Sequence, residues 1–200
     1  MLENTTKIHE FHDRIELLEA LPKGGRVAEV GVLTGTFSKQ INDIVKPDEL
    51  HLIDRWTYIW MDGQKLEIGD ELEEQVRTTF KDCSNVFIHR TTSLEASKLF
   101  PKRYFDWVYL DAGHQYHEIK EDIEVYRGLV KKWLIGHDFI SAETFGTSVI
   151  RAVIEATELY NMRLIALTAY DDIPRAPGVE PDFPWGERPI SWALEVPEAE

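Results

Sequence analysis

Short apolar runs that alternate with helical stretches constrain the fold of this chain most strongly. Seven runs are predicted to be strands, at residues 26–30, 50–54, 86–89, 105–111, 132–138, 163–168 and 191–196. Helical stretches separate most of them, including predicted helices near 115–130 and 146–160. Strands that alternate with helices form a mostly parallel sheet with helices on both faces. The pattern therefore predicts an α/β fold with a seven-stranded sheet.

Two further segments stand apart from this alternation. Apolar residues recur at helical spacing between Ile8 and Leu21, which predicts an amphipathic helix over 7–21 within an N-terminal segment, 1–24. Residues 171–189 hold prolines at 174, 177, 181, 184 and 189, a density typical of an ordered surface loop or lid. Because 200 residues suffice for one sizeable core, we expect 1–200 to be a single domain.

Charge and cysteine content narrow the partners and the compartment. A net charge of −14 repels polyanions, so we expect a small-molecule substrate, no nucleic acid and no membrane surface. The single cysteine, Cys83, cannot form an internal disulfide, which fits a reducing, cytoplasmic setting. The first helix could cover its own sheet or that of a second copy, so a homo-oligomer is left open.

A glycine turn follows the first predicted strand, in Ala-Glu-Val-Gly-Val-Leu-Thr-Gly-Thr-Phe-Ser at 28–38. Gly31 and Gly35 permit a positive φ and close approach of a ligand, and the N–H groups of the next helix suit an anionic group such as a carboxylate. Dinucleotide-binding folds need Gly-x-Gly-x-x-Gly, whereas Leu33 occupies the middle position here. A plain tight turn is the alternative interpretation.

Asp54 distinguishes between these two interpretations. It closes the next predicted strand, 23 residues after Gly31, where a carboxylate can accept hydrogen bonds from ribose hydroxyls. Together with Glu29, directly before the turn, it favours a riboside ligand over a turn without a ligand.

These residues resemble the first motifs of class I S-adenosylmethionine-dependent methyltransferases, in which acidic-x-Gly-x-x-x-Gly is followed by a second strand with an acidic end. Glu29, Gly31, Gly35 and Asp54 match this pattern. The closer resemblance is to the branch of macrocin-type sugar O-methyltransferases and cephalosporin hydroxylase-like proteins, in which this motif often ends in a serine, as it does here at Ser38. The resemblance implies a Rossmann-like domain that binds S-adenosylmethionine through these five residues.

The adenine end of the cofactor is less well matched. Many family members place an acidic residue there, after the third strand, whereas this chain has Thr91-Thr92-Ser93. The resemblance therefore implies that the hydroxyls of Thr92 and Ser93 serve that end of the cofactor.

A second cluster combines carboxylates and histidines. Asp111-x-x-His114 follows one predicted strand, and Gly136-His137-Asp138 ends the next. Neighbouring parallel strands end side by side, so Asp111 and Asp138 should converge beside the glycine turn and could hold Mg²⁺. The same branch contains similar segments, which implies that Asp111 and Asp138 bind the metal and that His114 is the catalytic base. We expect Asp111 to border the cofactor as well.

The predicted function is S-adenosylmethionine-dependent, Mg²⁺-assisted O-methylation of a small hydroxylated metabolite, either a sugar or a natural-product intermediate. One alternative is a regulatory domain that binds the cofactor without catalysis, because the branch's Pro-Gly-Gly turn is missing at 130–133 and Asp138 could be displaced. Another is an NAD-dependent oxidoreductase, although the glycine spacing departs from the dinucleotide-binding pattern. Asp111 could also be only a helix N-cap.

Aromatic residues suggest where an acceptor would bind. Trp56, Tyr58 and Trp60 follow a strand end, and Trp185 lies in the proline-rich segment. They could wall the acceptor pocket or serve as ordinary packing anchors.

Overall fold

The computed structural model describes residues 7–57, 59–61, 64–140, 148–169 and 190–197. The strands are β1 (His9–Phe11), β2 (Arg26–Val30), β3 (Glu49–Asp54), β4 (Ile59–Met61), β5 (Gln64–Leu66), β6 (Val86–Arg90), β7 (Phe105–Leu110), β8 (Val130–Gly136), β9 (Arg163–Thr168) and β10 (Trp192–Glu195). The helices are α1 (Arg14–Ala20), α2 (Thr36–Val45), α3 (Gly69–Thr79), α4 (Ser93–Ser97), α5 (Tyr116–Tyr126) and α6 (Ser148–Leu159).

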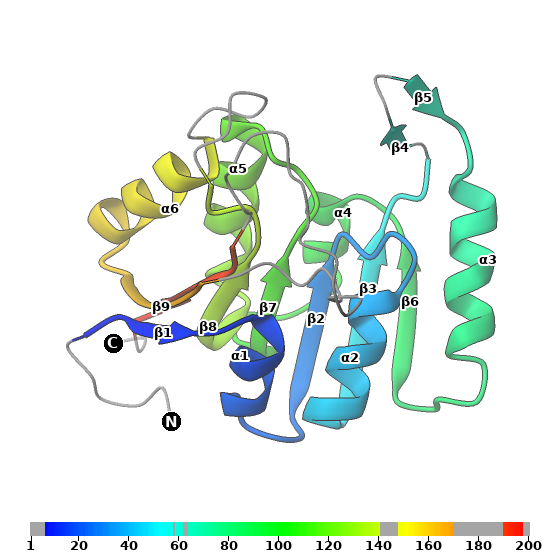
Figure 1. The fold of residues 1–200 in the computed structure, drawn as a ribbon, viewed down its shortest axis with the longest axis horizontal. Helices are drawn as coiled ribbons and strands as arrows, with labels where there is room; N and C mark the ends of the chain where they lie inside the picture. Colours follow the sequence, from blue (N-terminus) through cyan, green and yellow to red (C-terminus); the bar gives the residue numbers. More distant parts are fainter. Residues whose placement is uncertain (1–6, 58, 62–63, 141–147, 170–189, 198–200) are drawn as a thin grey trace, which may run out of the picture.

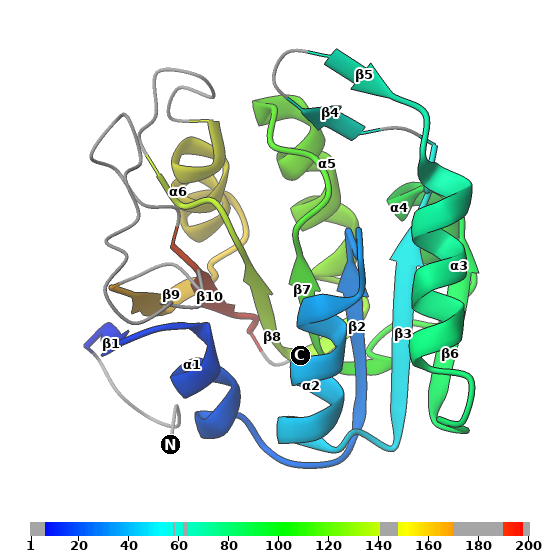
Figure 2. The same ribbon diagram turned by 45° about the vertical axis from the view of Figure 1, so that its right-hand side comes forward.

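Eight strands form one sheet in the order β1-β9-β10-β8-β7-β2-β3-β6. From β8 to β6 the strands are parallel, whereas β10 runs antiparallel to both β8 and β9. Because β2, β3 and β7 point the same way, their carboxyl ends meet at one edge of the sheet, the upper edge in Figure 1. The short β4–β5 hairpin lies beyond this edge, near the start of α3, as Figures 1 and 2 both show.

Helices cover both faces of the sheet, as the sequence predicts. On one face, α1, α2 and α3 bury apolar side chains such as Leu17, Ile41 and Val76. On the other face, α4, α5 and α6 bury side chains such as Ile123 and Val153. Strand residues alternate between the two cores, so the central strands are apolar on both faces, as expected for covered parallel strands.

The α/β architecture is confirmed, but the sheet has eight strands instead of the predicted seven, and it is mixed because β10 is antiparallel to both of its neighbours. The additional strand, β1, falls inside the predicted helix 7–21 and pairs with β9. The helix begins only at Arg14, because Asp13 accepts a hydrogen bond from the backbone N of Glu16 at 3.0 Å and caps it. The sequence contained this capping signal, but the apolar period of Ile8 and Phe11 obscured it.

Candidate active site

The glycine turn joins β2 to α2 through left-handed backbone. Gly31 has a φ of 93°, Leu33 of 53° and Gly35 of 77°. A Cβ on Gly31 would lie 2.0 Å from the carbonyl oxygen of Asp111, because the end of β7 presses against the turn. Only glycine fits at position 31, for reasons of both conformation and space.

Glu29 and Ser38 meet beneath this turn. Glu29 is 2% exposed and accepts a hydrogen bond from the buried Ser38 hydroxyl in the first turns of α2. Burial raises the pKa of Glu29 to about 8, with a further increase from the charges of Asp111 and Asp54, although Ser38 and Arg14 act to lower it. The Glu29 carboxyl is therefore mostly protonated at neutral pH.

Asp54 ends β3 and holds the other side of the turn. Its Oδ2 accepts hydrogen bonds from the backbone N of Val32 at 2.8 Å and of Leu33 at 3.0 Å, and its Oδ1 accepts one from the backbone N of Trp56 at 2.8 Å. A carboxylate has about four acceptor positions, so capacity remains for a further donor. Sequence reasoning missed the role of Asp54 in closing the turn, and its role toward ribose stays a prediction.

Thr92 and Ser93 lie at the start of α4, beyond the end of β6. The Thr92 side chain caps the helix by accepting a hydrogen bond from the backbone N of Glu95 at 3.3 Å. Ser93 contacts α5, since its carbonyl accepts a hydrogen bond from the Tyr126 hydroxyl at 2.8 Å. Their contact with adenine stays a prediction.

Asp111, His114 and Asp138 come together next to the turn. His114 Nε2 lies 2.9 Å from Asp138 Oδ2 and 3.4 Å from Asp111 Oδ1. Each side chain offers one ligand atom, and the three ligand atoms lie within 4.8 Å of one another. Two carboxylate oxygens and an imidazole nitrogen fit a divalent cation: Mg²⁺ favours the oxygens, and the nitrogen also admits Mn²⁺ or Zn²⁺.

The charges of this cluster depend on one another. Burial lowers the pKa of His114, but hydrogen bonds and charges of Asp111 and Asp138 raise it more, to about 10. Burial acts to raise the pKa of Asp138, but His114 and His137 hold it well below its usual range. Without a metal ion the His114 imidazolium is therefore the cation that the two carboxylates share.

The missing Pro-Gly-Gly turn does not displace Asp138. β8 begins at Val130, shortly after α5 ends at Tyr126, and the residues that follow β8 still bring Asp138 Oδ2 to 2.9 Å from His114 Nε2. Asp138 adopts a left-handed φ of 57°, which aspartate tolerates better than most residues. The geometric reason for supposing that catalysis has been lost is thus removed.

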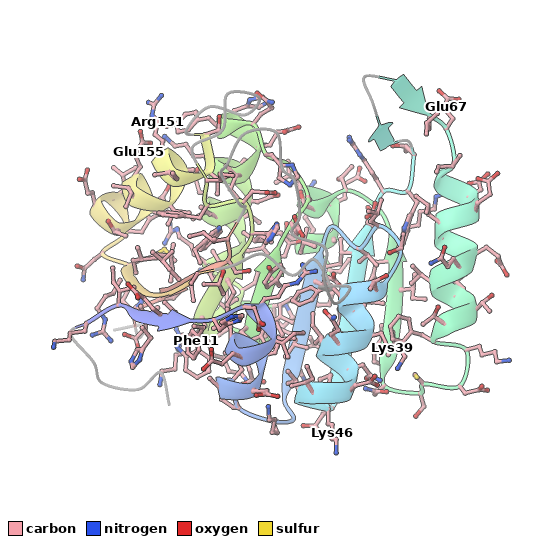
Figure 3. The ribbon with its side chains drawn as sticks, in the orientation of Figure 1. Phe11, Lys39, Lys46, Glu67, Arg151 and Glu155 are labelled. Carbon is pink, nitrogen blue, oxygen red and sulfur yellow. The ribbon has the colours of Figure 1, made fainter. Side chains whose placement is uncertain are left out.

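Asp111 is not the cap of α5. Gln115 and Glu118 form a reciprocal capping box at the start of this helix. The same helix start is tied to α6, because the Tyr116 hydroxyl donates a hydrogen bond to Glu155. Glu155 also accepts one from Arg151 Nε at 2.9 Å, and Figure 3 labels both of these α6 side chains. These contacts fix the segment that carries His114.

Sequence reasoning gave His137 no role, yet it borders the cluster. Its Nδ1 lies 3.5 Å from Asp138 Oδ1 and 3.8 Å from Asp111 Oδ1, and its side chain is only 11% exposed. Trp192 of β10 donates from its indole nitrogen to the His137 carbonyl at 3.0 Å. In the sequence, the Gly-His-Asp pattern places His137 directly beside Asp138, and this was the available signal that His137 borders the cluster. The contact with Trp192 had no such signal, because it depends on the antiparallel pairing of β10 with β8.

The aromatic residues divide into two groups. Trp56 is 3% exposed and packs into the core, so it is an anchor and not a wall of an open pocket. The predicted pocket residues Tyr58 and Trp185 and the segment 171–189 lie outside the described residues, as does the side chain of Trp60.

The family model of the methyltransferase domain matches residues 28–139, more than half of the chain and all of the glycine turn. The chain belongs to this family. It is a class I S-adenosylmethionine-dependent methyltransferase. No curated protein matches its sequence significantly.

Solved structures agree with the fold of this methyltransferase. TYW2 of M. jannaschii, in complex with AdoMet, is 15% identical with a TM-score of 0.58 over 92% of this chain and 75% of that one. The tRNA methyltransferase TrmK of B. subtilis is 14% identical with a TM-score of 0.58 over 94% and 67%. Precorrin-6y C5,15-methyltransferase of Geobacter metallireducens is 10% identical with a TM-score of 0.57 over 92% and 84%.

These neighbours correct one expectation. The sequence analysis excluded nucleic acid as a partner from the charge of −14, and this exclusion is wrong. Net charge averages over the whole surface, whereas a fold shared with a tRNA methyltransferase accommodates very different acceptors. No helix in the described part of the chain is long and apolar enough to cross a membrane.

Proposed function

We propose that this methyltransferase transfers a methyl group to a hydroxyl oxygen of its acceptor with the help of a divalent cation. Asp111 and Asp138 are the proposed ligands of the cation, and His114 is the proposed base. The convergence of these three side chains beside the glycine turn carries the proposal. It also agrees with the macrocin-type branch that the sequence resembles.

The cofactor is proposed to lie along the glycine turn, bordered by Glu29, Gly31, Gly35, Ser38 and Asp54, with Asp111 next to it and Thr92 and Ser93 at its adenine end. When bound, S-adenosylmethionine supplies an electrophilic methyl group on a sulfonium. The start of α2 has no side-chain cap at Gly35, so its N–H groups can receive an anionic group of the cofactor. The neutral Glu29 carboxyl adds no full negative charge beneath that group.

The proposed proton transfer depends on the charge of His114. When bound, a divalent cation supplies positive charge that acidifies a hydroxyl and disfavours the proton on His114. His114 Nε2 then accepts the hydroxyl proton, while Asp138 and Asp111 remain ionised beside it. The main contribution of the chain is alignment, because a cationic donor and an anionic oxygen neutralise each other.

The proposed acceptor is a small hydroxylated metabolite, either a sugar or a natural-product intermediate. The proposed cation at Asp111 and Asp138 would bind an acceptor through a hydroxyl oxygen, and this supports a hydroxylated acceptor. The ribose 2′-hydroxyl of RNA offers the same chemistry and therefore belongs among the acceptors to be compared.

Radiolabelled S-adenosylmethionine tests the proposal with panels of sugars, phenols and RNA, each with Mg²⁺ and with EDTA. We expect label on a hydroxyl acceptor, at least about a hundredfold less with EDTA or in Asp138→Asn. Transfer to a nitrogen or carbon acceptor, or transfer that EDTA leaves unchanged, would refute metal-assisted O-methylation.

Metal titration separates the two roles that His114 could have. Mn²⁺ affinity, followed by calorimetry, should fall strongly in Asp138→Asn and little in His114→Ala if His114 is the base. An equal loss of Mn²⁺ affinity in both variants would make His114 a third ligand and overturn its assignment as the base.

A further inference from the structure

Trp56 contacts the glycine turn from the side of β3. Its indole Nε1 donates a hydrogen bond to the Leu33 carbonyl at 3.0 Å, and its backbone N donates to Asp54 Oδ1 at 2.8 Å. Leu33 has a left-handed φ of 53° that glycine would adopt more easily. The hydrogen bond from Trp56 therefore holds the one residue of the turn whose backbone conformation is disfavoured.

Trp56 is itself fixed by its surroundings. Its own φ is 40°, and its carbonyl accepts a hydrogen bond from Arg90 Nη2 at 2.9 Å. The backbone of Gly69 presses against the same carbonyl, since a Cβ there would lie 1.8 Å from the oxygen. Gly69 begins α3, so the conformation of Trp56 is coupled to the position of that helix.

Arg90 connects Trp56 to α3 through charge. Its Nη1 lies 2.7 Å from Glu73 Oε2, and its Nη2 lies 2.6 Å from Asp70 Oδ1. Arg77 pairs with the other oxygen of Glu73 at 2.6 Å. Arg90 is thus the cation that joins these two carboxylates of α3 to the Trp56 backbone.

α3 also backs the turn directly. Gln75 Nε2 donates a hydrogen bond to the Thr34 carbonyl at 3.3 Å. The Val76 side chain lies 3.1 Å from where a Cβ of Gly35 would be. Trp56 and α3 therefore support the outer side of the turn over Leu33, Thr34 and Gly35.

We propose that Trp56 is a positioning residue for S-adenosylmethionine, acting through the Leu33 carbonyl and locked to α3 by Arg90. A ligand binds more tightly to a turn that is already ordered in the binding conformation, because less conformational entropy is lost on binding. Trp56 thus sets the affinity for the cofactor. This inference rests on the cofactor of the family and is independent of the proposed metal site and acceptor.

Trp56→Phe tests the indole hydrogen bond, because phenylalanine keeps an aromatic ring and loses the donor. Trp133→Phe is the matched control: Trp133 is 4% exposed in the same core, and its indole nitrogen has no hydrogen-bond partner among the described residues. Calorimetry with S-adenosylmethionine should show a Kd about tenfold higher in Trp56→Phe and within about twofold of wild type in Trp133→Phe.

Arg90→Gln tests the connection that Arg90 makes between α3 and the Trp56 carbonyl, and Arg77→Gln is the matched control. Both substitutions remove one positive charge and one pairing with Glu73, and Arg90→Gln also removes the pairing with Asp70. Only Arg90→Gln releases the Trp56 carbonyl. We expect its Kd for S-adenosylmethionine to rise about threefold above that of Arg77→Gln.

Hydrogen exchange distinguishes positioning from general loss of stability. Trp56→Phe should speed exchange of the amides in 31–38 without changing it in β8, at a melting temperature similar to that of Trp133→Phe. Equal Kd values within either matched pair, or unchanged exchange at 31–38, would overturn the proposal. If Trp56→Phe does not fold, the arginine pair alone decides.

Discussion

Glu29→Gln gives the sharpest test of the electrostatics beneath the glycine turn. Burial raises the pKa of Glu29 from 4.5 to about 8, so the folded chain holds a proton that the unfolded chain releases between these pH values. This contribution to stability is fully present below about pH 4.5 and is lost as the pH rises through about 8. Each pH unit between the two pKa values corresponds to about 1.36 kcal/mol, which sets an upper bound of about 5 kcal/mol.

Glutamine keeps the shape of Glu29 and an oxygen that accepts from Ser38, but it cannot ionise. The free energy of unfolding of Glu29→Gln relative to wild type should therefore rise by about 3 kcal/mol between pH 5 and pH 9, after discounting for local relaxation. Urea denaturation of both proteins at each pH measures this difference, in which pH effects common to both cancel.

Asp122→Asn provides the control with a different pH window. Asp122 is 4% exposed, and burial raises its pKa from 3.8 to about 6, against a hydrogen bond from Ser93. The free energy of unfolding of Asp122→Asn relative to wild type should rise between about pH 4 and pH 6 and stay level above about pH 7. A Glu29→Gln difference that stays level from pH 5 to pH 9 would refute the reasoning, because Glu29 would then ionise normally in the folded chain.

Three further substitutions test the packing around the site. Gly31→Ala should lower the free energy of unfolding by about 3 kcal/mol or more in a urea titration, because its Cβ would lie 2.0 Å from the Asp111 carbonyl oxygen at a positive φ. Gly128→Ala is the control. Its Cβ would lie 3.6 Å from the nearest atom, so the same titration should show a change of about 0.5 kcal/mol or less. Ser38→Ala removes a donor to buried Glu29 and should cost about 1–3 kcal/mol, measured by thermal unfolding near pH 8, with an unchanged melting temperature as the contrary result. Gly136→Ala would place a Cβ 2.4 Å from the Trp192 indole and should weaken Mn²⁺ binding at Asp138 about tenfold; an unaltered titration would show that β10 does not position this segment.

Local sequence signals predicted most elements of the fold. β2 and β9 have the predicted bounds, and most of the other elements differ by only a few residues at their ends. Apolar runs and glycine turns encode such elements directly. The strand β1 was not predicted, because a strand of three residues is too short to show an alternating apolar pattern. It forms only by pairing with β9.

The site was predictable where one motif supplies several groups. Asp111 and His114 are three residues apart, and Asp138 closely follows the end of the neighbouring strand β8, so parallel pairing of β7 and β8 was enough to bring them together. The hydrogen bonds of Asp54 to the turn could not be predicted in this way, since they depend on the side-chain direction at the end of β3.

The sequence by itself determined a glycine turn with positive φ and the acidic strand ends around it, because these features depend on local spacing. Its resemblance to class I methyltransferases indicated the class of cofactor. Only the tertiary structure decided that Glu29 is mostly neutral at pH 7 and that Trp56 supports the turn. It also decided that His114 shares its proton with two carboxylates. Burial and long-range contacts set these properties, and neither is encoded in any single stretch of the chain.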